Sequence, residues 1–424
     1  MNLKNTADQA FVRDVNLSSV LRVIHTEAPL SRAQLAVITG LNKSTISSLV
    51  EELLARGLIH ETGTNSTGTG RPSTLLDINP QAGQIIGVEL GVDFVSVALT
   101  DFLGKILWRS TEAADPTDKQ DNTISQTLAL VNEALENSRK QGSFVLGLGL
   151  SIPGTVDLKE GVMIFAPNLQ WHDVPLQRIF SEPTGLRVFI ENDANAAAIA
   201  EHLFGVARGC SDFIFVFAGV GIGGGLFLNG HLYRGNNGYA GEIGHSPIVA
   251  EPAQALCHCG NRGCWETYAN QASIIQRVQS RLDMKRSSIV PSLMAEQNTP
   301  LTISIIKQAA DAGDCEAIEA FSEAGLAMGQ GFASLINIFN PDKIILGGPL
   351  SSVGNYLLPS IKEAVDKHSL PEIDQQVEVR LSTFGPDASL IGAISLVVDD
   401  ILSNPTHVER RWSNREPVSV LKAL

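Results

Sequence analysis

The chain has 424 residues, of which 44% are hydrophobic and 18% are charged, a composition that excludes a disordered or fibrous protein and predicts two or three folded domains. Its net charge of −14 is divided unevenly, because residues 1–75 carry seven Lys and Arg against six Asp and Glu and the remainder carries −15. DNA repels an acidic surface, so any contact with nucleic acid is expected from the first segment.

The apolar runs and the cysteines bear on location. No apolar signal core follows residues 1–6, and no apolar run approaches the roughly 18 residues of a membrane helix. Three of the five cysteines lie within residues 257–264, which is not the spread of a disulfide framework, and Cys210 and Cys315 are expected to be small core residues. We therefore expect a cytoplasmic protein with reduced thiols and no membrane span.

Helical patterns open the chain. Leu17–His25 places apolar residues on one face. Ser31 and Gln34 have the spacing of a capping box, Gly40 ends that short helix, and Asn42 caps the next one. Two capped helices separated by a turn predict a helix-turn-helix. The polar face of the second of these would meet DNA with Lys43, Ser44, Thr45, Ser47 and Ser48.

Two strand-like segments then predict a wing. Leu58–Thr62 and Ser73–Ile78 flank the loop Gly63–Gly70, and Arg71 at the tip suits a narrow minor groove. The helix pair alone is equally typical of a solvated surface or a protein-docking module, whereas the helices, the wing and Arg71 together favour DNA binding. We predict a winged helix-turn-helix domain over residues 1–80.

The remainder alternates strands with helices and repeats its opening. A strand–turn–strand pattern at residues 85–101 returns at 213–228, where Gly219–Gly225 fills the turn. This recurrence predicts a duplicated α/β architecture with a ligand cleft between two lobes. The glycine run itself is consistent with a phosphate-cradling loop and with a tight hairpin.

Cysteine spacing predicts a metal site. Cys257-x-Cys259 and then Cys264, with glycines between, present three thiolates to one tetrahedral ion, and three buried free thiols are the alternative. His245 and His258 are both candidate fourth ligands. His245 is preferred because His258 lies between two ligating cysteines and should point away. Four protein ligands leave no open position, so the predicted Zn²⁺ is structural.

A further polar group, Glu191-Asn192-Asp193, ends a predicted strand before an alanine-rich helix. At such a junction Asn192 and Asp193 can make paired hydrogen bonds to hydroxyls. A helix N-cap is the alternative interpretation of Asp193.

Together these motifs resemble the ROK family of repressors, open reading frames and kinases, over nearly the whole chain. The metal element is the most specific of them, and the helix-turn-helix in front is similar to the repressor branch, the xylose repressors in particular. The motifs are Glu242-x-Gly-His245, Cys257-x-Cys259-Gly-x-x-Gly-Cys264-x-Glu266, Glu191-Asn-Asp-Ala-Asn195 and Gly221-Ile-Gly-Gly-Gly225.

The resemblance implies an actin-like, duplicated sugar-kinase fold. We place a first lobe at residues 81–195, completed by about 388–405, a second lobe with the zinc site and an oligomerisation surface at 196–387, and a tail at 406–424. The implied zinc ligands are His245, Cys257, Cys259 and Cys264. The implied sugar contacts are Asn168, Asn192, Asp193, Glu242, His245 and Glu266.

The chain departs from the kinases of the family on the nucleotide side. Their Asp-x-Gly-Gly-Thr-Lys is replaced by Glu89-Leu-Gly-Val-Asp93-Phe94, which lacks the Thr and Lys and adds an acid that repels phosphate, and Val220 stands at a usual threonine. Asp193 matches the kinase general base, yet one base cannot supply the positioning and charge neutralisation of phosphoryl transfer. We therefore expect no catalytic residue and no enzyme activity.

The expected function is transcriptional repression. A homodimer or homotetramer would bind a palindromic double-stranded DNA operator and release it when a monosaccharide, with xylose the first candidate, occupies the cleft. Glucose and N-acetylated hexosamines stay open as effectors. An ATP-dependent sugar kinase and a repressor controlled by a protein partner are the alternative functions.

Overall fold

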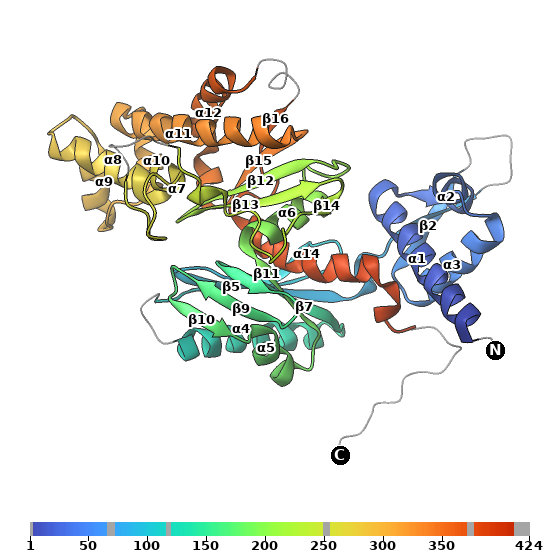
Figure 1. The fold of residues 1–424 in the computed structure, drawn as a ribbon. Helices are drawn as coiled ribbons and strands as arrows, with labels where there is room; N and C mark the ends of the chain where they lie inside the picture. Colours follow the sequence, from blue (N-terminus) through green and yellow to red (C-terminus); the bar gives the residue numbers. More distant parts are fainter. Residues whose placement is uncertain (1–2, 66–72, 116–119, 249–254, 371–376, 411–424) are drawn as a thin grey trace.

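The computed structural model describes residues 3–65, 73–115, 120–248, 255–370 and 377–410. Figure 1 shows two lobes, one above the other, and a smaller domain beside them that contains the N-terminus. Within the described residues, no helix is long and apolar enough to span a membrane.

The small domain contains the predicted helix-turn-helix. Ser31 forms the capping box with Gln34, Gly40 ends its helix in the left-handed conformation at φ 70°, and the Asn42 side chain accepts a hydrogen bond from the Thr45 amide. Its helices are α1 (Leu3–Glu27), α2 (Arg32–Thr39) and α3 (Lys43–Ala55).

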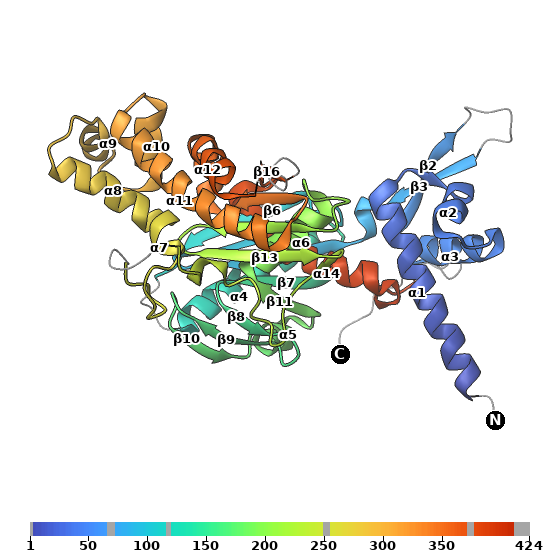
Figure 2. The same cartoon turned by 45° about the horizontal axis from the view of Figure 1, so that its top comes forward.

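Helix α1 begins at Leu3 instead of near Leu17, so the predicted start was wrong. Phe11, Val12 and Val15 are each more than half exposed, so this part of the helix lacks the buried stripe by which periodicity detects a helix. Figure 2 shows it projecting beyond the rest of the small domain.

The wing is a hairpin within a three-stranded sheet of order β1-β3-β2. Strand β2 continues to Asn65, past the predicted end at Thr62. Arg71, the predicted tip contact, lies outside the described residues and remains a prediction. The strands are β1 (Leu30–Ser31), β2 (Ile59–Asn65) and β3 (Ser73–Ile78).

The two lobes contain five-stranded sheets of the same topology, which confirms the predicted duplication. Their orders are β11-β7-β4-β5-β6 and β14-β13-β12-β15-β16. In each, three consecutive strands form an antiparallel meander. Two later strands extend the sheet next to the first strand of the meander and run parallel to it. The first sheet consists of β4 (Gln84–Leu90), β5 (Phe94–Thr100), β6 (Ile106–Ala113), β7 (Val145–Ile152) and β11 (Val188–Asn192). The second consists of β12 (Phe213–Ala218), β13 (Ile222–Leu228), β14 (His231–Leu232), β15 (Lys343–Gly347) and β16 (Glu378–Leu381).

The glycine-rich run is a tight hairpin. Gly223–Gly225 belong to β13 and pair with β12, so the turn itself is short. A Cβ on Gly225 would lie 2.5 Å from the Ala198 Cβ, so glycine lets the helix that precedes this hairpin, over residues 193–204, pack directly on the strand. Of the two interpretations, the hairpin is confirmed.

Two helices, α6 (Asp193–Phe204) and α14 (Ala388–Ser403), cross between the lobes. Helix α6 leaves the first sheet and packs on β12 and β13, whereas α14 leaves the second sheet and packs on β4 and β7. Their contact is close, because a Cβ on Gly392 would lie 2.4 Å from the Ala196 backbone. Figure 1 shows α14 continuing from this crossing to the small domain.

The remaining elements cover the lobes. Cys315, expected in the core, is the exposed first residue of α11, so that prediction was wrong. A small sheet has the order β10-β9-β8 and consists of β8 (Thr155–Asp157), β9 (Val162–Ala166) and β10 (Trp171–Val174). The helices are α4 (Gln120–Lys140), α5 (Leu176–Thr184), α7 (Glu266–Ala269), α8 (Gln271–Asp283), α9 (Val290–Gln297), α10 (Ile303–Asp311), α11 (Cys315–Phe339) and α12 (Gly354–His368).

Candidate functional site

A cleft of about 600 Å³ opens between the two lobes. The turn after β4, the start of α6, the β12–β13 turn and the segment before the cysteine cluster all contribute to its wall. The structure brings all the predicted sugar contacts to this one cleft. They are Asn168, Asn192, Asp193, Glu242, His245 and Glu266.

The start of α6 places two of these residues. Asn192, and not Asp193, is the N-cap, because its side-chain oxygen accepts from the amides of Ala194 and Asn195 at 3.0 and 3.2 Å. Its amide nitrogen donates to the Gly154 carbonyl at 3.1 Å, so the side chain holds the cleft wall together. Asp193 accepts from the Ala194 amide at 2.8 Å, which fixes its carboxylate at the cleft.

A second acid, Glu89, was not among the predicted sugar contacts. It lies at 7% exposure near the end of β4 and lines the same cleft. Burial and the neighbouring Asp193 raise the pKa of Glu89 to about 8, while burial and Glu242 raise the pKa of Asp193 to about 7. Both carboxyls therefore retain protons to unusually high pH and can donate hydrogen bonds to hydroxyls as well as accept them. The sequence signal was present, since Glu89-x-Gly91 stands where the kinases have Asp-x-Gly.

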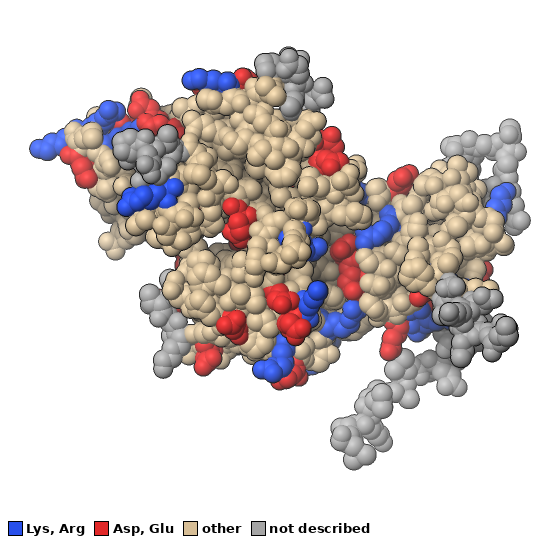
Figure 3. Space-filling model, in the orientation of Figure 1, with Lys and Arg blue, Asp and Glu red and all other residues tan. Residues whose placement is uncertain are grey.

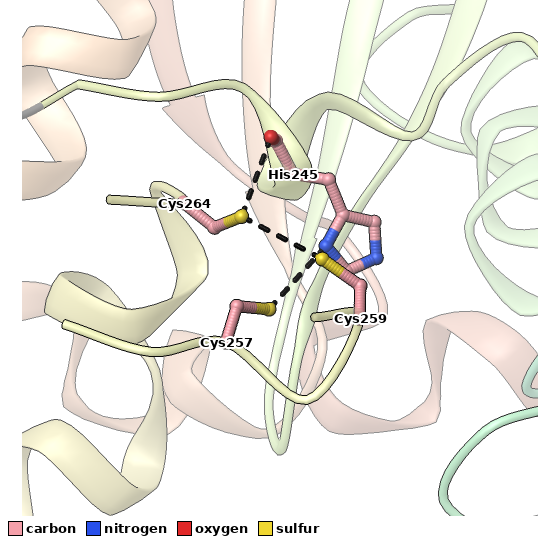
Figure 4. A group of neighbouring side chains, drawn as sticks. All are labelled: His245, Cys257, Cys259 and Cys264. Carbon is pink, nitrogen blue, oxygen red and sulfur yellow. Dashed lines mark hydrogen bonds between the residues drawn. The ribbon is translucent and has the colours of Figure 1, made fainter. Parts of the chain in front are cut away.

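A compact cluster of His245, Cys257, Cys259 and Cys264 lies beside the cleft, with all ligand atoms within 4.8 Å of one another. Figure 4 shows the side chains converging from separate segments. The Cys259 and Cys264 sulfurs are 3.8 Å apart, and the Cys257 sulfur is 3.6 Å from His245 Nδ1. A tetrahedral ion with Zn–S bonds of about 2.3 Å would set two sulfurs about 3.8 Å apart, so this donor set fits zinc. His258 is exposed and outside the cluster.

The two predicted glutamates link the cluster to the cleft. Glu266 Oε1 accepts from the Cys257 thiol at 2.9 Å and lies 3.5 Å from His245 Nδ1. Glu242 Oε2 lies 3.7 Å from the other ring nitrogen, and its side chain is half exposed to the cleft. Any ion held by the cluster would therefore fix groups that also face a cleft ligand.

The candidate DNA face lies on the outer side of α3. Lys43, Ser44 and Ser48 are exposed, and Thr45 and Ser47 are partly so. The Ser44 hydroxyl donates to the Asn42 side chain at 2.7 Å, so this surface is ordered by the cap. The arrangement matches the predicted face at these five residues, while their contact with DNA remains a prediction.

Helix α14 connects the cleft with the small domain. At its first turn, Ser389 lines the cleft and its hydroxyl lies 2.5 Å from that of Ser151. At its last turns, Asp399 pairs with Arg22 of α1 at 2.9 Å, and the Leu402 carbonyl accepts from Ser18 at 2.8 Å. Figure 3 shows acidic and basic side chains side by side along this junction.

The residues after α14 also bind the small domain. Arg56, at the end of α3, donates to the Val408 carbonyl, and Val408 is buried in the hydrophobic cluster that the small domain shares with α6 and α14. The carboxylate of Glu52 on α3 pairs with Arg13, Arg56 and Arg410. Helix α3 is thus held from behind by the segment that follows the two lobes.

Two parts of the chain match the models of known protein families. The ROK family model matches residues 85–400, and the MarR family model matches residues 18–68. The chain belongs to the ROK family. Its fold is a winged helix domain followed by the actin-like sugar-kinase fold of that family.

Named relatives include regulators. This ROK protein is 32% identical to the xylose repressor of Bacillus subtilis (strain 168) over 399 residues, or 93% of this chain and 98% of that one. It is 31% identical to the DNA-binding transcriptional dual regulator NagC of Escherichia coli (strain K12) over 387 residues, or 91% of this chain and 93% of that one.

Solved structures include both branches of the family. A ROK family transcriptional regulator, a homolog of the E. coli Mlc protein, has a TM-score of 0.80 at 28% identity and covers 94% of this chain and 99% of that one. A ROK family glucokinase from Streptomyces griseus, in complex with glucose and AMPPNP, has a TM-score of 0.67 at 32% identity. It matches over 99% of its own length but 74% of this chain.

Proposed function

We propose that this ROK protein is a cytoplasmic transcriptional repressor, which binds operator DNA through α3 and the wing and releases it when a monosaccharide occupies the cleft. Xylose is the first candidate effector, because a xylose repressor is among the named relatives. NagC, described as a regulator, is nearly as similar, so N-acetylglucosamine belongs in the same test.

The observation that carries this proposal is the course of α14. Its first turn borders the cleft at Ser389, and its last turns contact α1 through Asp399 and Leu402. A sugar that closes the lobes would displace the two ends together, since α14 packs on the first-lobe sheet and on α6. For release to follow, sugar must bind the released arrangement more tightly than the DNA-bound one.

The decisive experiment measures operator affinity with and without sugar. An operator duplex is selected from a random pool with the zinc-loaded protein, and its dissociation constant is measured by fluorescence anisotropy. We expect saturating xylose to weaken binding by about tenfold or more, within the usual range of allosteric coupling energies. Glucose, fructose and N-acetylglucosamine form the comparison panel.

Asp193→Asn tests whether the cleft receives the effector. This variant should retain operator binding and lose the sugar response, whereas Asp283→Asn, at an exposed position on α8, should behave as wild type. Unchanged operator affinity with every sugar would count against a sugar effector. If adding a protein from the same cell then released the DNA, control by a protein partner would replace this proposal.

The cluster is proposed to hold one structural Zn²⁺ through His245, Cys257, Cys259 and Cys264. Cys259→Ser should abolish zinc retention after dialysis, while Cys315→Ser, which changes another exposed cysteine, should retain about one ion per chain. Elemental analysis gives the zinc content, and thermal melting gives the accompanying loss of stability. Wild-type protein that contains no zinc and melts unchanged in chelator would refute the assignment.

One observation favours the alternative of a sugar kinase. The raised pKa of Asp193, at about 7, suits a general base near neutral pH. Against it, Asp93, Phe94 and Val220 line the nucleotide side of the cleft in place of the kinase Thr and Lys. We propose that the chain does not turn over ATP. Sugar-dependent formation of ADP in the presence of magnesium would overturn this part of the proposal.

A further inference from the structure

A second cavity, of about 590 Å³, lies between α1 and the sugar-binding lobes. Arg22, His25 and Thr26 of α1 form one side. Helix α6, the turn between β13 and β14, and the end of α14 form the other. Among the described residues it shares no lining residue with the sugar cleft, so a ligand there would be distinct from the effector proposed above.

The described lining of this cavity carries an excess of cationic groups. Arg22, Arg208 and Arg234 line it, and Asp399 is the one carboxylate among its described lining residues. Arg22 pairs with Asp399 at 2.9 Å, so the negative charge of Asp399 is already neutralised and does not offset the other arginines. Arg234 turns toward the cleft side and pairs with Glu191 at 2.8 Å.

Arg208 is the cation left without a counter-charge. Its guanidinium donates to the backbone carbonyls of His25 and Thr26, at 2.7 Å to the latter, in the last turns of α1. Among the described residues no carboxylate forms an ion pair with it. Carbonyl dipoles at a helix C-terminus offset a cation only in part, so positive potential remains at this wall.

Two neighbouring histidines add no charge of their own to this cavity. Burial, then the nearby Arg208 and Arg22, lower the pKa of His25 to about 4, and burial is the first cause that lowers the pKa of His202. Both rings are therefore neutral near pH 7. His202 Nδ1 is buried and has no hydrogen-bond partner among the described residues, while His231 is exposed at the rim.

We propose that this interdomain cavity binds a small phosphorylated metabolite. Its phosphate would lie against Arg208 and His231, because charge-assisted hydrogen bonds to phosphate are the strong ones available here. Its carbon skeleton would lie against the apolar Leu203, Phe227 and Leu402. Since the walls come from both domains, such a ligand stabilises one arrangement of the two.

The cavity is also connected to the sugar cleft. Glu191, the partner of Arg234, accepts from the Asn192 amide at 3.0 Å and from the Asn195 side chain at 3.2 Å, and it lines the cleft. An anion that draws Arg234 toward the second cavity would compete with this ion pair. The second site would thereby act on the residues that contact sugar, and its ligand would modulate the response to the first effector.

Isothermal titration calorimetry of full-length, zinc-loaded protein tests the site in the absence of DNA. The probes are inorganic phosphate and glucose 6-phosphate, each titrated in the presence of saturating xylose so that the cleft is occupied. We expect Arg208→Gln and His231→Asp to raise the dissociation constant by about tenfold or more, by removing a cation and by adding a carboxylate at an exposed rim position. Lys367→Gln, which removes an exposed cation on α12, is the matched control.

Each result decides the question. Binding of either probe that is weakened by both cavity variants and not by Lys367→Gln supports the site, and a preference for glucose 6-phosphate shows that the apolar wall takes part. Failure of both probes to bind would overturn the proposal. Equal affinity in all variants would also overturn it, because it would indicate an adventitious ion only. Melting curves identify a variant that has lost its fold, and His231→Asp, which changes an exposed side chain, keeps the test valid if Arg208→Gln unfolds. A titration weakened by Asp193→Asn and unaffected by Arg208→Gln would place the anion in the sugar cleft and overturn the proposal too.

Discussion

At the scale of single residues, the paired acids Glu89 and Asp193 are the most informative feature of the cleft. Glu89 lies on β4 and Asp193 begins α6, and burial is the first cause that raises the pKa of each, with Asp193 adding to the shift of Glu89 and Glu242 to that of Asp193. A carboxyl whose pKa is raised on folding binds more protons when folded than when unfolded. Its contribution to stability is therefore largest below its unfolded pKa and is lost as the pH rises toward its folded pKa.

Glu89→Gln should remove that pH dependence, because glutamine imitates the protonated carboxyl at every pH. Between pH 6 and pH 8, the stability advantage of the variant over wild type should grow by at most about 1.4 kcal/mol per pH unit. Urea unfolding at several pH values, with zinc present throughout, measures this difference. Glu133→Gln, an exposed position on α4, is the control and should follow wild type. Parallel curves for wild type and Glu89→Gln would show that Glu89 is ionised in the folded protein.

At the scale of elements, the crossing of α6 and α14 joins the two lobes. Each helix starts in one lobe and packs on the sheet of the other, so movement of the lobes must pass through their contact. Gly392 lies where the helices approach most closely, with the Ala196 backbone 2.4 Å from the position of an added Cβ. The rigid backbone of α6 cannot yield there as a flexible side chain would.

Gly392→Ala should therefore destabilise the protein by about 1–3 kcal/mol, although alanine is the better helix former. Ser395→Ala removes a hydroxyl that bonds within the same helix, to the Ile391 carbonyl at 2.8 Å, and should cost less. Denaturant unfolding of the two variants provides the comparison. A more stable Gly392→Ala variant would show that the helices can separate freely at this point.

At the scale of the whole molecule, the lobes are acidic and the small domain is nearly neutral, so DNA contact is expected from the small domain. A single winged helix presents one recognition helix, so high affinity for a palindrome requires two copies in one assembly. We predict that the DNA-bound species is a dimer or a tetramer. Sedimentation of the protein–operator complex measures its mass, and a bound monomer would contradict the prediction.

Operator spacing gives an independent test of the same point. Insertion of about five base pairs between half-sites rotates them to opposite faces of the duplex and should weaken binding, whereas about ten should restore it. Equal affinity for all three duplexes would indicate that the copies bind independently.

Local features were readable from the sequence because they depend on neighbours in the chain. The capping box of Ser31 and Gln34, the end of α2 at Gly40 and the cap at Asn42 each involve residues a few positions apart. The cysteine spacing likewise restricts which thiols can share an ion, and the repeated strand–turn–strand pattern revealed two lobes before their sheets were seen.

Other features required the tertiary structure. Glu89 and Asp193 are 104 positions apart, and Arg56 meets Val408 across 352 positions, so no local pattern relates them. The projecting start of α1 buries no apolar stripe that periodicity could detect, and Gly223–Gly225 belong to a strand because they pair with β12, which the sequence does not show. Sequence by itself determined the caps, the cysteine cluster and the repeated architecture, since short-range hydrogen bonds and spacing suffice for them. The protonation of the cleft acids, the cationic cavity and the path from cleft to recognition helix were decided by packing, because burial and charge proximity exist only after distant segments meet.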